Sequence, residues 1–126
     1  NKPFVFHIVQ AHGKALEILK DYSVIGFVHS FSGSIEFAEQ YLSNNILLSF
    51  GPNILNDNFK KAQEALAKLP AEALLFESDT PSNAIDDGNP NLMFLKVLEK
   101  AAEIRSSSVE ELKNLHQKNL ANLMNE

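Results

Sequence analysis

The chain has 126 residues, inside the roughly 100 to 200 residues of a typical domain, and no linker or low-complexity segment divides it, so we expect a single domain over residues 1–126. It contains no cysteine, which excludes a disulfide framework and a thiolate zinc site. A formal charge of -5 argues against a broad basic surface for nucleic acid. A nucleic-acid substrate would have to be held locally, for example through bound cations.

The longest apolar runs are shorter than the roughly 18 residues of a membrane span, and nothing resembles a signal peptide. With the lack of cysteine, this favours a cytoplasmic protein that does not associate with a membrane. The sequence starts at Asn1 rather than at a methionine, and we expect further residues upstream.

Short apolar runs alternate with longer amphipathic ones. The short runs are nearly continuous, which predicts parallel strands buried on both faces. They are Phe4 to Val9, Val24 to Val28, Ile46 to Phe50 and Leu74 to Phe76. The longer stretches carry apolar residues at spacings of three and four, which predicts helices with one buried stripe. Their stripes are Ala15, Leu16 and Leu19, then Ile35, Ala38 and Leu42, then Phe59, Ala62, Leu66 and Leu69.

Helix ends are also marked in the sequence. Ser34 is placed to cap the second of these helices, and Asp57 the third. Two further helical segments follow the last strand, Asn91 to Ile104 and Val109 to Met124. The final segment is preceded by Ser108 and carries glutamate three residues later, which fits a capping box.

Four consecutive strand-helix units indicate an α/β fold, either an open doubly wound sheet or half of an eight-stranded barrel. No G-x-G-x-x-G phosphate loop is present, so we favour four βα units of a TIM-type (β/α)8 barrel followed by an extra C-terminal helix. Half a barrel leaves two unpaired strand edges and an uncovered inner face. We therefore expect this chain to associate with another half.

Three polar residues stand where apolar strands end: His7, His29 and Asp79. Catalytic groups of α/β barrels gather at the C-terminal ends of the strands, so these side chains are expected in one basin. Singly, each has an ordinary reading, because strand-end histidines are often structural and aspartate often opens a turn. Together they are as consistent with a metal site as with structural roles.

Other polar residues lie close to these positions. Glu77 stands two residues before Asp79, so strand alternation places both on one face. His12 starts a helix, where it is either a rim residue or a substrate contact. The serines of residues 30–34 are best explained by capping, although the free N–H groups of the next helix could also face a phosphate.

Longer motifs make the pattern specific. The runs PFVFHIVQAHGKALEIL, GFVHSFSGS, LLSFG and LLFESDTP occur in that order, and the last helix ends in KNLA. Over essentially the whole chain, these motifs resemble the second half of the TatD family of metal-dependent hydrolases. The resemblance implies a barrel fold and relatives that include Mg-dependent deoxyribonucleases, and hence DNA as a substrate.

By this resemblance, His7 and His29 match the histidine ligands on the fifth and sixth strands, and Asp79 matches the aspartate after the eighth. One or two divalent ions, Zn, Mn or Mg, would activate a water and neutralise phosphate oxygens. Asp79 would be the catalytic residue that orients or deprotonates this water. Glu77 resembles the family's glutamate in the same motif, and a role in orienting the ligands is favoured over direct binding.

The family's H-x-H pair on the first strand and its bridging glutamate on the fourth strand are absent from these residues. The resemblance therefore implies that activity needs a missing N-terminal barrel half, supplied in cis or in trans. Two alternatives stay open. The chain is a catalytically inactive half-barrel used for folding or assembly, or it is an open flavodoxin-like binding domain, which requires a strand order that is not sequential.

Overall fold

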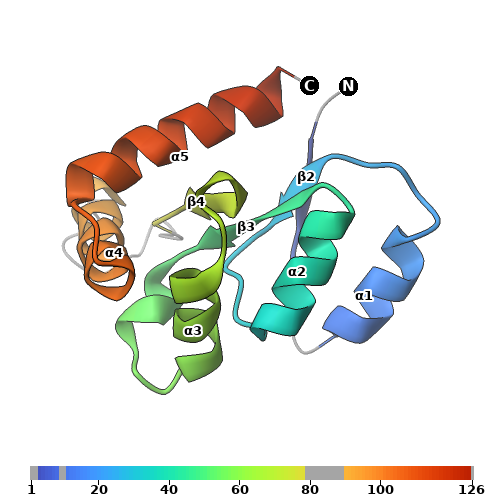
Figure 1. Ribbon diagram of the computed structural model, residues 1–126, viewed down its shortest axis with the longest axis horizontal. Helices are drawn as coiled ribbons and strands as arrows, with labels where there is room; N and C mark the ends of the chain where they lie inside the picture. The colour runs from blue at the N-terminus through green and yellow to red at the C-terminus, as the bar shows by residue number, and fades with distance from the viewer. Residues whose placement is uncertain (1–2, 9–10, 79–89, 126) are drawn as a thin grey trace.

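A computed structural model of the chain describes residues 3–8, 11–78 and 90–125 (Figure 1). Strands and helices alternate through most of it. The strands are β1 (Phe4–Phe6), β2 (Gly26–Val28), β3 (Ile46–Phe50) and β4 (Leu74–Phe76). The α-helices are α1 (His12–Leu19), α2 (Ile35–Ser43), α3 (Lys60–Lys68), α4 (Pro90–Arg105) and α5 (Val109–Met124). Two short 3-10 helices, Pro52–Leu55 and Ala71–Ala73, precede α3 and β4.

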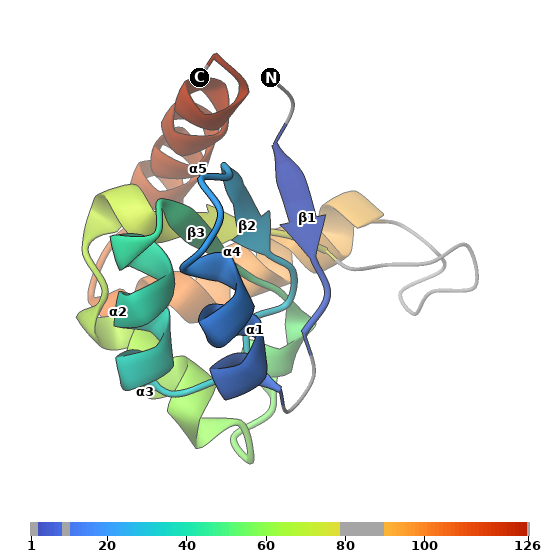
Figure 2. The same ribbon diagram turned by 90° about the vertical axis from the view of Figure 1, so that its right-hand side faces the viewer.

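The four strands form one parallel sheet in the order β1-β2-β3-β4. This sequential order, with helices between the strands, confirms the half-barrel prediction. The flavodoxin-like alternative is wrong, because that fold places its second strand outside its first. Figure 2 shows α1 and α2 on the same side of the sheet, and α1 packs against α2, α2 against α3 and α3 against α4.

The core lies between the sheet and this row of helices. Val28, Leu48 and Phe50 are 0% exposed, since they alternate along β2 and β3 toward the helices. All of β4 is buried, as the continuous apolar run predicts. The same expectation is wrong for β1, where Phe4 and Val5 are about half exposed. Within the described residues β1 has a strand neighbour on one side only, because it ends the sheet.

Two of the predicted helix caps are confirmed. The Ser34 side chain accepts a hydrogen bond from the Phe37 N–H at 3.3 Å at the start of α2. At the start of α5, the Ser108 side chain accepts from the Glu111 N–H at 3.1 Å, and the Glu111 carboxylate accepts from the Ser108 N–H at 3.0 Å. Each cap satisfies N–H groups that have no partner inside the helix.

The predicted cap by Asp57 is wrong. Helix α3 begins at Lys60, so its capping position falls on Phe59, which makes no side-chain cap. Asp57 instead accepts a hydrogen bond from the Gln63 side chain at 3.1 Å, and its carboxylate lies 3.6 Å from the Lys100 ammonium. The aspartate stands too far before the helix to reach its first N–H groups.

Helices α4 and α5 complete the described fold. The Arg105 guanidinium, at the end of α4, donates to the carbonyls of Leu66 and Leu69 at 2.7 Å each and so satisfies the C-terminal end of α3. Helix α5 runs beside β4, where the Asn119 side chain donates to the Leu74 carbonyl at 2.7 Å. No helix in the described part of the chain is long and apolar enough to span a bilayer.

Candidate metal centre at the strand ends

Two histidines meet at the carboxyl ends of neighbouring strands. His7 follows β1 and His29 follows β2, and the register that pairs Phe6 with Val28 places the next residues side by side. The His29 N–H donates to the Phe6 carbonyl at 2.8 Å, which extends the pairing to this point. Their ring centroids lie 4.6 Å apart, and His7 is exposed. Two imidazoles thus share one end of the sheet.

Glu77 reaches the same place from β4. Its N–H donates to the Phe50 carbonyl at 3.0 Å, which fixes the backbone beside β3. Its carboxylate contacts the His29 Nδ1 through one oxygen and accepts the Ser30 N–H at 2.7 Å through the other. An ionised carboxylate can only accept, so the His29 Nδ1 is the donor in this contact. The glutamate therefore fixes the orientation of the His29 ring.

A glycine makes this reach possible. Glu77 follows β4 and His29 follows β2, so the carboxylate must pass the end of β3, where Gly51 stands. A Cβ atom at Gly51 would lie 3.1 Å from the Glu77 Cγ and 3.5 Å from the Ser30 Oγ. The 3.5 Å contact is ordinary, but the 3.1 Å contact would require the glutamate side chain to shift by a few tenths of an ångström, so position 51 favours glycine.

Ser30 has a backbone conformation that few residues adopt. Its φ is 51°, in the left-handed region, and this turns the chain immediately after His29. The turn directs the Ser30 N–H to the Glu77 carboxylate, and the Ser30 Oγ accepts from the Asn53 side chain at 3.4 Å. The strained turn and the carboxylate thus support one another.

Asp79, the third predicted ligand, lies outside the described residues. Among residues 3–8, 11–78 and 90–125, no group of three or more histidine, aspartate or glutamate side chains is arranged to hold a metal ion. The structure therefore brings together His7, His29 and Glu77, with the glutamate turned to the His29 Nδ1. These are two candidate ligands and one orienting carboxylate.

His12 lies in the packing between α1 and α2. It is 7% exposed, its Nδ1 is 2.7 Å from the Tyr41 hydroxyl, and its ring packs against Phe31 and Phe37. Burial lowers the pKa of His12 and raises the pKa of Tyr41 to about 12. A hydrogen bond between two neutral groups fits such a site, because burial penalises the charged forms.

Sequence reasoning missed the roles of Ser30, Gly51 and Asn53. A glycine directly after the apolar run of β3 is the signal that was available, since glycine at a strand end often marks a close approach. Nothing in the sequence indicates the contact between Asn53 and Ser30, because it joins a 3-10 helix to a turn 23 positions away.

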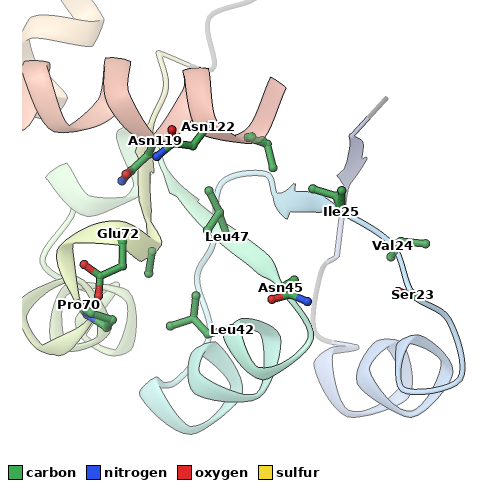
Figure 3. Close-up of a pocket in the computed structure, with 12 residues that line it drawn as sticks. Ser23, Val24, Ile25, Leu42, Asn45, Leu47, Pro70, Glu72, Asn119 and Asn122 are labelled. Carbon is green, nitrogen blue, oxygen red and sulfur yellow. The ribbon is translucent and has the colours of Figure 1, made fainter. Parts of the chain in front are cut away.

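The chain also has a pocket of about 690 Å³ at the opposite end of the strands (Figure 3). It lies between the segments that enter β2, β3 and β4 and the end of α5, where Asn119, Asn122 and Leu123 line it. The histidines and Glu77 follow the strands, whereas these segments precede them. The pocket is therefore separate from the histidine pair.

The fold and the site together define a class: an α/β-barrel architecture with its polar groups at the carboxyl ends of the strands. Within this class, the chain belongs to the TatD family, because the family model described as TatD related DNase matches residues 1–125. The sequence resemblance drawn from the strand-end motifs is confirmed.

Relatives and solved structures agree with this assignment. YabD of Bacillus subtilis, named an uncharacterized metal-dependent hydrolase, is 31% identical over 98% of this chain and 51% of its own length. A protein of Encephalitozoon cuniculi, named as a candidate deoxyribonuclease and TATDN1 homolog, is 36% identical over 62% of this chain and 28% of its own length. The chain thus spans about half the length of YabD, and its match covers less than a third of the Encephalitozoon cuniculi protein.

The crystal structure of YJJV, a TatD homolog of Escherichia coli, matches with a TM-score of 0.87 and 27% identity. The match covers 98% of this chain and 50% of that one. A TatD family hydrolase of Entamoeba histolytica matches at 0.81 with 20% identity, over 97% of this chain and 50% of that one, which supports the fold alone.

Proposed function

We propose that this chain is the C-terminal half of a divalent-metal-dependent hydrolase that cleaves phosphodiester bonds in DNA. His7, His29 and Asp79 are its metal ligands, and Asp79 is its catalytic residue. The observation that carries the proposal is the pair of imidazoles at 4.6 Å, one of them oriented by the Glu77 carboxylate. Histidines that bind metals commonly donate their other ring N–H to a carboxylate in this way.

The residues present fit a divalent ion in their chemistry. Imidazole nitrogens suit Zn and Mn, and an added carboxylate and a phosphate substrate suit Mg or Mn. Zinc takes four ligands, or three and a water, so two histidines do not complete a site. The remaining ligands in this proposal are Asp79 and groups from the other half of the barrel, for one ion or two.

When bound, the ion would lower the pKa of a coordinated water and neutralise charge on the phosphate oxygens. The chain's own residues prepare this site. Glu77 keeps the proton on the His29 Nδ1, so that Nε2 is the nitrogen that presents a lone pair, and the Ser30 N–H holds the glutamate in place. In the proposal, Asp79 orients the water and accepts its proton.

DNA is the proposed substrate for two reasons. The family is described as TatD related DNase, and one relative is named as a candidate deoxyribonuclease. With a formal charge of -5, the chain has no excess of cations for the phosphates of a long duplex. Bound metal ions would make up for this lack of cationic side chains, because the ions supply the positive charge at the scissile phosphate.

Metal content tests the proposal. The purified chain is dialysed against Zn²⁺ or Mn²⁺, and its metal is counted by plasma mass spectrometry beside His29→Ala and, as a histidine-deletion control, His116→Gln. We expect one or more equivalents in the chain and the control, and a loss in His29→Ala. Equal metal in all three proteins contradicts the proposal and favours the inactive half-barrel, whereas no metal in any of them means that the site needs the ligands of the other half.

A further inference from the structure

The Ser30 hydroxyl lies on the face of the sheet that carries the candidate metal centre. Phe50 is 0% exposed and faces the helices, and the backbone of Gly51 after it is extended, with φ -123° and ψ -157°. Alternation along the strand therefore directs a Cβ atom at Gly51 to the opposite face. This atom would lie 3.5 Å from the Ser30 Oγ and 3.1 Å from the Glu77 Cγ. The hydroxyl and the glutamate thus lie side by side, next to the His29 ring that Glu77 contacts.

The backbone holds this hydroxyl in one place. The Ser30 N–H donates to the Glu77 carboxylate at 2.7 Å, and the next N–H, of Phe31, donates to the Ser49 carbonyl at 2.8 Å. The φ of 51° at Ser30 is one that glycine adopts without steric cost and serine rarely adopts. A serine at a backbone position that favours glycine indicates a use for its side chain, because strained residues gather at functional sites.

Asn53 brings a second donor to the same place. It lies in the 3-10 helix Pro52–Leu55, which is anchored by Ile54, a residue that is 0% exposed and donates its N–H to the Gly51 carbonyl at 3.1 Å. The Asn53 side-chain nitrogen lies 3.4 Å from the Ser30 Oγ, farther than the roughly 2.9 to 3.0 Å of a typical hydrogen bond of this kind. A hydroxyl has one O–H and a carboxamide two N–H groups. The pair can therefore donate two hydrogen bonds to a third group.

Two converging donors at this point suit an oxygen that carries negative charge. Such an oxygen would be repelled by the neighbouring Glu77 carboxylate, and the proposed divalent ion at His7 and His29 would offset this repulsion. Phosphate oxygens accept hydrogen bonds from serine and asparagine side chains as well as from cationic ones. Neutral donors that are held in place before the substrate arrives stabilise negative charge as it develops in a transition state.

We propose that the Ser30 O–H and an Asn53 side-chain N–H together bind a non-bridging oxygen of the scissile phosphate. The two groups orient the phosphate at the metal centre, so they determine the specificity of the chain for phosphate esters. The inference rests on the proposed function, from which it takes the phosphodiester substrate and the divalent ion. It adds the side chains of this chain that hold the substrate.

Ser30→Gly removes the hydroxyl and keeps the turn, because glycine adopts a φ of 51° and retains the N–H that Glu77 accepts. The test uses the complete barrel, with this chain joined to its other half, in Mg²⁺ or Mn²⁺ and with a thymidine dinucleotide as substrate. We expect kcat/KM to fall about 10 to 100-fold, as for the loss of a hydrogen bond to a charged group. Ser106→Gly is the matched control, because Ser106 has a φ of 54° and lies just after α4. It should leave kcat/KM unchanged.

Substitutions at Asn53 separate a contact with phosphate from a contact with Ser30 alone. Asn53→Asp keeps the size of the side chain and can accept the Ser30 O–H, but it loses both N–H groups and adds a negative charge. We expect it to lower kcat/KM by about hundredfold or more, and Asn53→Ala, which adds no charge, by about tenfold. Asn56→Asp is the control, because the exposed Asn56 side chain accepts the Asn58 N–H at 2.9 Å and an aspartate can do the same.

Binding of inorganic phosphate gives a second measurement that does not depend on turnover. Isothermal titration calorimetry of the metal-loaded complete barrel should show affinity for phosphate about tenfold weaker in Ser30→Gly and in Asn53→Ala than in the wild type. Plasma mass spectrometry should find the same metal content in all three proteins, because the Ser30 N–H and the Glu77 carboxylate are retained. A role in holding the metal centre would lower the metal content instead.

Three results overturn the inference while the wild type remains active. They are an unchanged kcat/KM in Ser30→Gly, an Asn53→Asp variant as active as the wild type, and a loss of metal in Ser30→Gly. The first two would mean that the pair only holds the turn, and the third that the hydroxyl acts on the metal centre. A complete wild-type barrel that binds metal and cleaves no phosphodiester contradicts the proposed function itself, so the two failures are distinguishable.

Discussion

The chain has four histidines, and they fall into two pairs with opposite surroundings. His7 and His29 follow strands, lie with their rings 4.6 Å apart and are exposed or partly exposed. His12 and His116 lie on helices, pack against aromatic rings, and have pKa values that burial lowers. The nitrogens of the helix pair bond inside the fold, to the Tyr41 hydroxyl and the Phe76 N–H.

The comparison shows what divides a structural histidine from a candidate ligand. A bonded ring nitrogen does not by itself mark a histidine as structural, because the His29 Nδ1 is also bonded, to the Glu77 carboxylate. The carboxylate holds the His29 ring in one orientation at the carboxyl ends of the strands, where the carboxylate of a ligand histidine is commonly found. Burial among rings instead favours a neutral histidine that accepts or donates within the core.

The largest effect is expected at the strand-end pair. His29→Ala removes one of the two imidazoles and should weaken zinc binding by more than about hundredfold, since even residues that only orient ligands are worth about 10 to 100-fold. Isothermal titration calorimetry measures this. His116→Gln is the matched control, and comparable weakening in both variants would remove the distinction between the two pairs.

The next largest effect is expected at Glu77, whose carboxylate orients the His29 ring. Glu77→Gln keeps the size of the side chain and an acceptor for the Ser30 N–H, but it loses the charge beside the His29 Nδ1. We expect zinc affinity to fall about 10 to 100-fold with little loss of stability. Glu72→Gln, at an exposed glutamate near the other end of β4, serves as control. A tenfold gain in affinity would show that the carboxylate competes with the metal.

Disrupting the buried hydrogen bond between His12 and Tyr41 should change the stability of the fold rather than metal binding. Tyr41→Phe leaves the His12 Nδ1 without its partner in the core, which costs about 1 to 3 kcal/mol of the free energy of unfolding. Zinc affinity should stay the same. Urea denaturation followed by circular dichroism measures the loss, and Tyr22→Phe, at an exposed tyrosine, is the control. An unchanged unfolding midpoint would mean that the hydrogen bond does not contribute.

The smallest effect is a dependence of stability on pH. Because the pKa values of His12 and His116 are lowered in the fold, the unfolded chain takes up protons more readily, and the contribution to stability is complete above about pH 6.5. It is lost as pH falls from there through the lowered values. Urea midpoints between pH 7.5 and pH 5 measure this, and His116→Gln should flatten the slope. A midpoint that rises on acidification contradicts it.

The sequence predicts most of the fold because its signals are local. Continuous apolar runs located all four strands, and β3 and β4 have the predicted bounds. Helix α5 also has the predicted bounds, since a capping box marks its start. Asp57 was misassigned, because the choice between capping and bonding Gln63 depends on where α3 begins. The exposure of β1 was not predictable from its own residues, because it depends on which part of the protein covers the edge of the sheet.

The candidate site was predictable in its residue types and not in its contacts. Strand ends pointed to His7 and His29, and the two-residue spacing from Asp79 pointed to Glu77. The hydrogen bond from the Ser30 N–H to the Glu77 carboxylate joins residues 47 positions apart. It depends on a left-handed turn at Ser30 and on a glycine at position 51. Such contacts join residues that are far apart in the sequence, and no local pattern specifies them.

The most direct measurement observes all four imidazole rings at once, in a long-range ¹H–¹⁵N spectrum recorded while Zn²⁺ is added to the chain. The account predicts that the Nε2 signal of His29 shifts on binding while its Nδ1 keeps the proton, that His7 responds with it, and that His12 and His116 do not change. Shifts at His12 or His116 with none at His29 would contradict it.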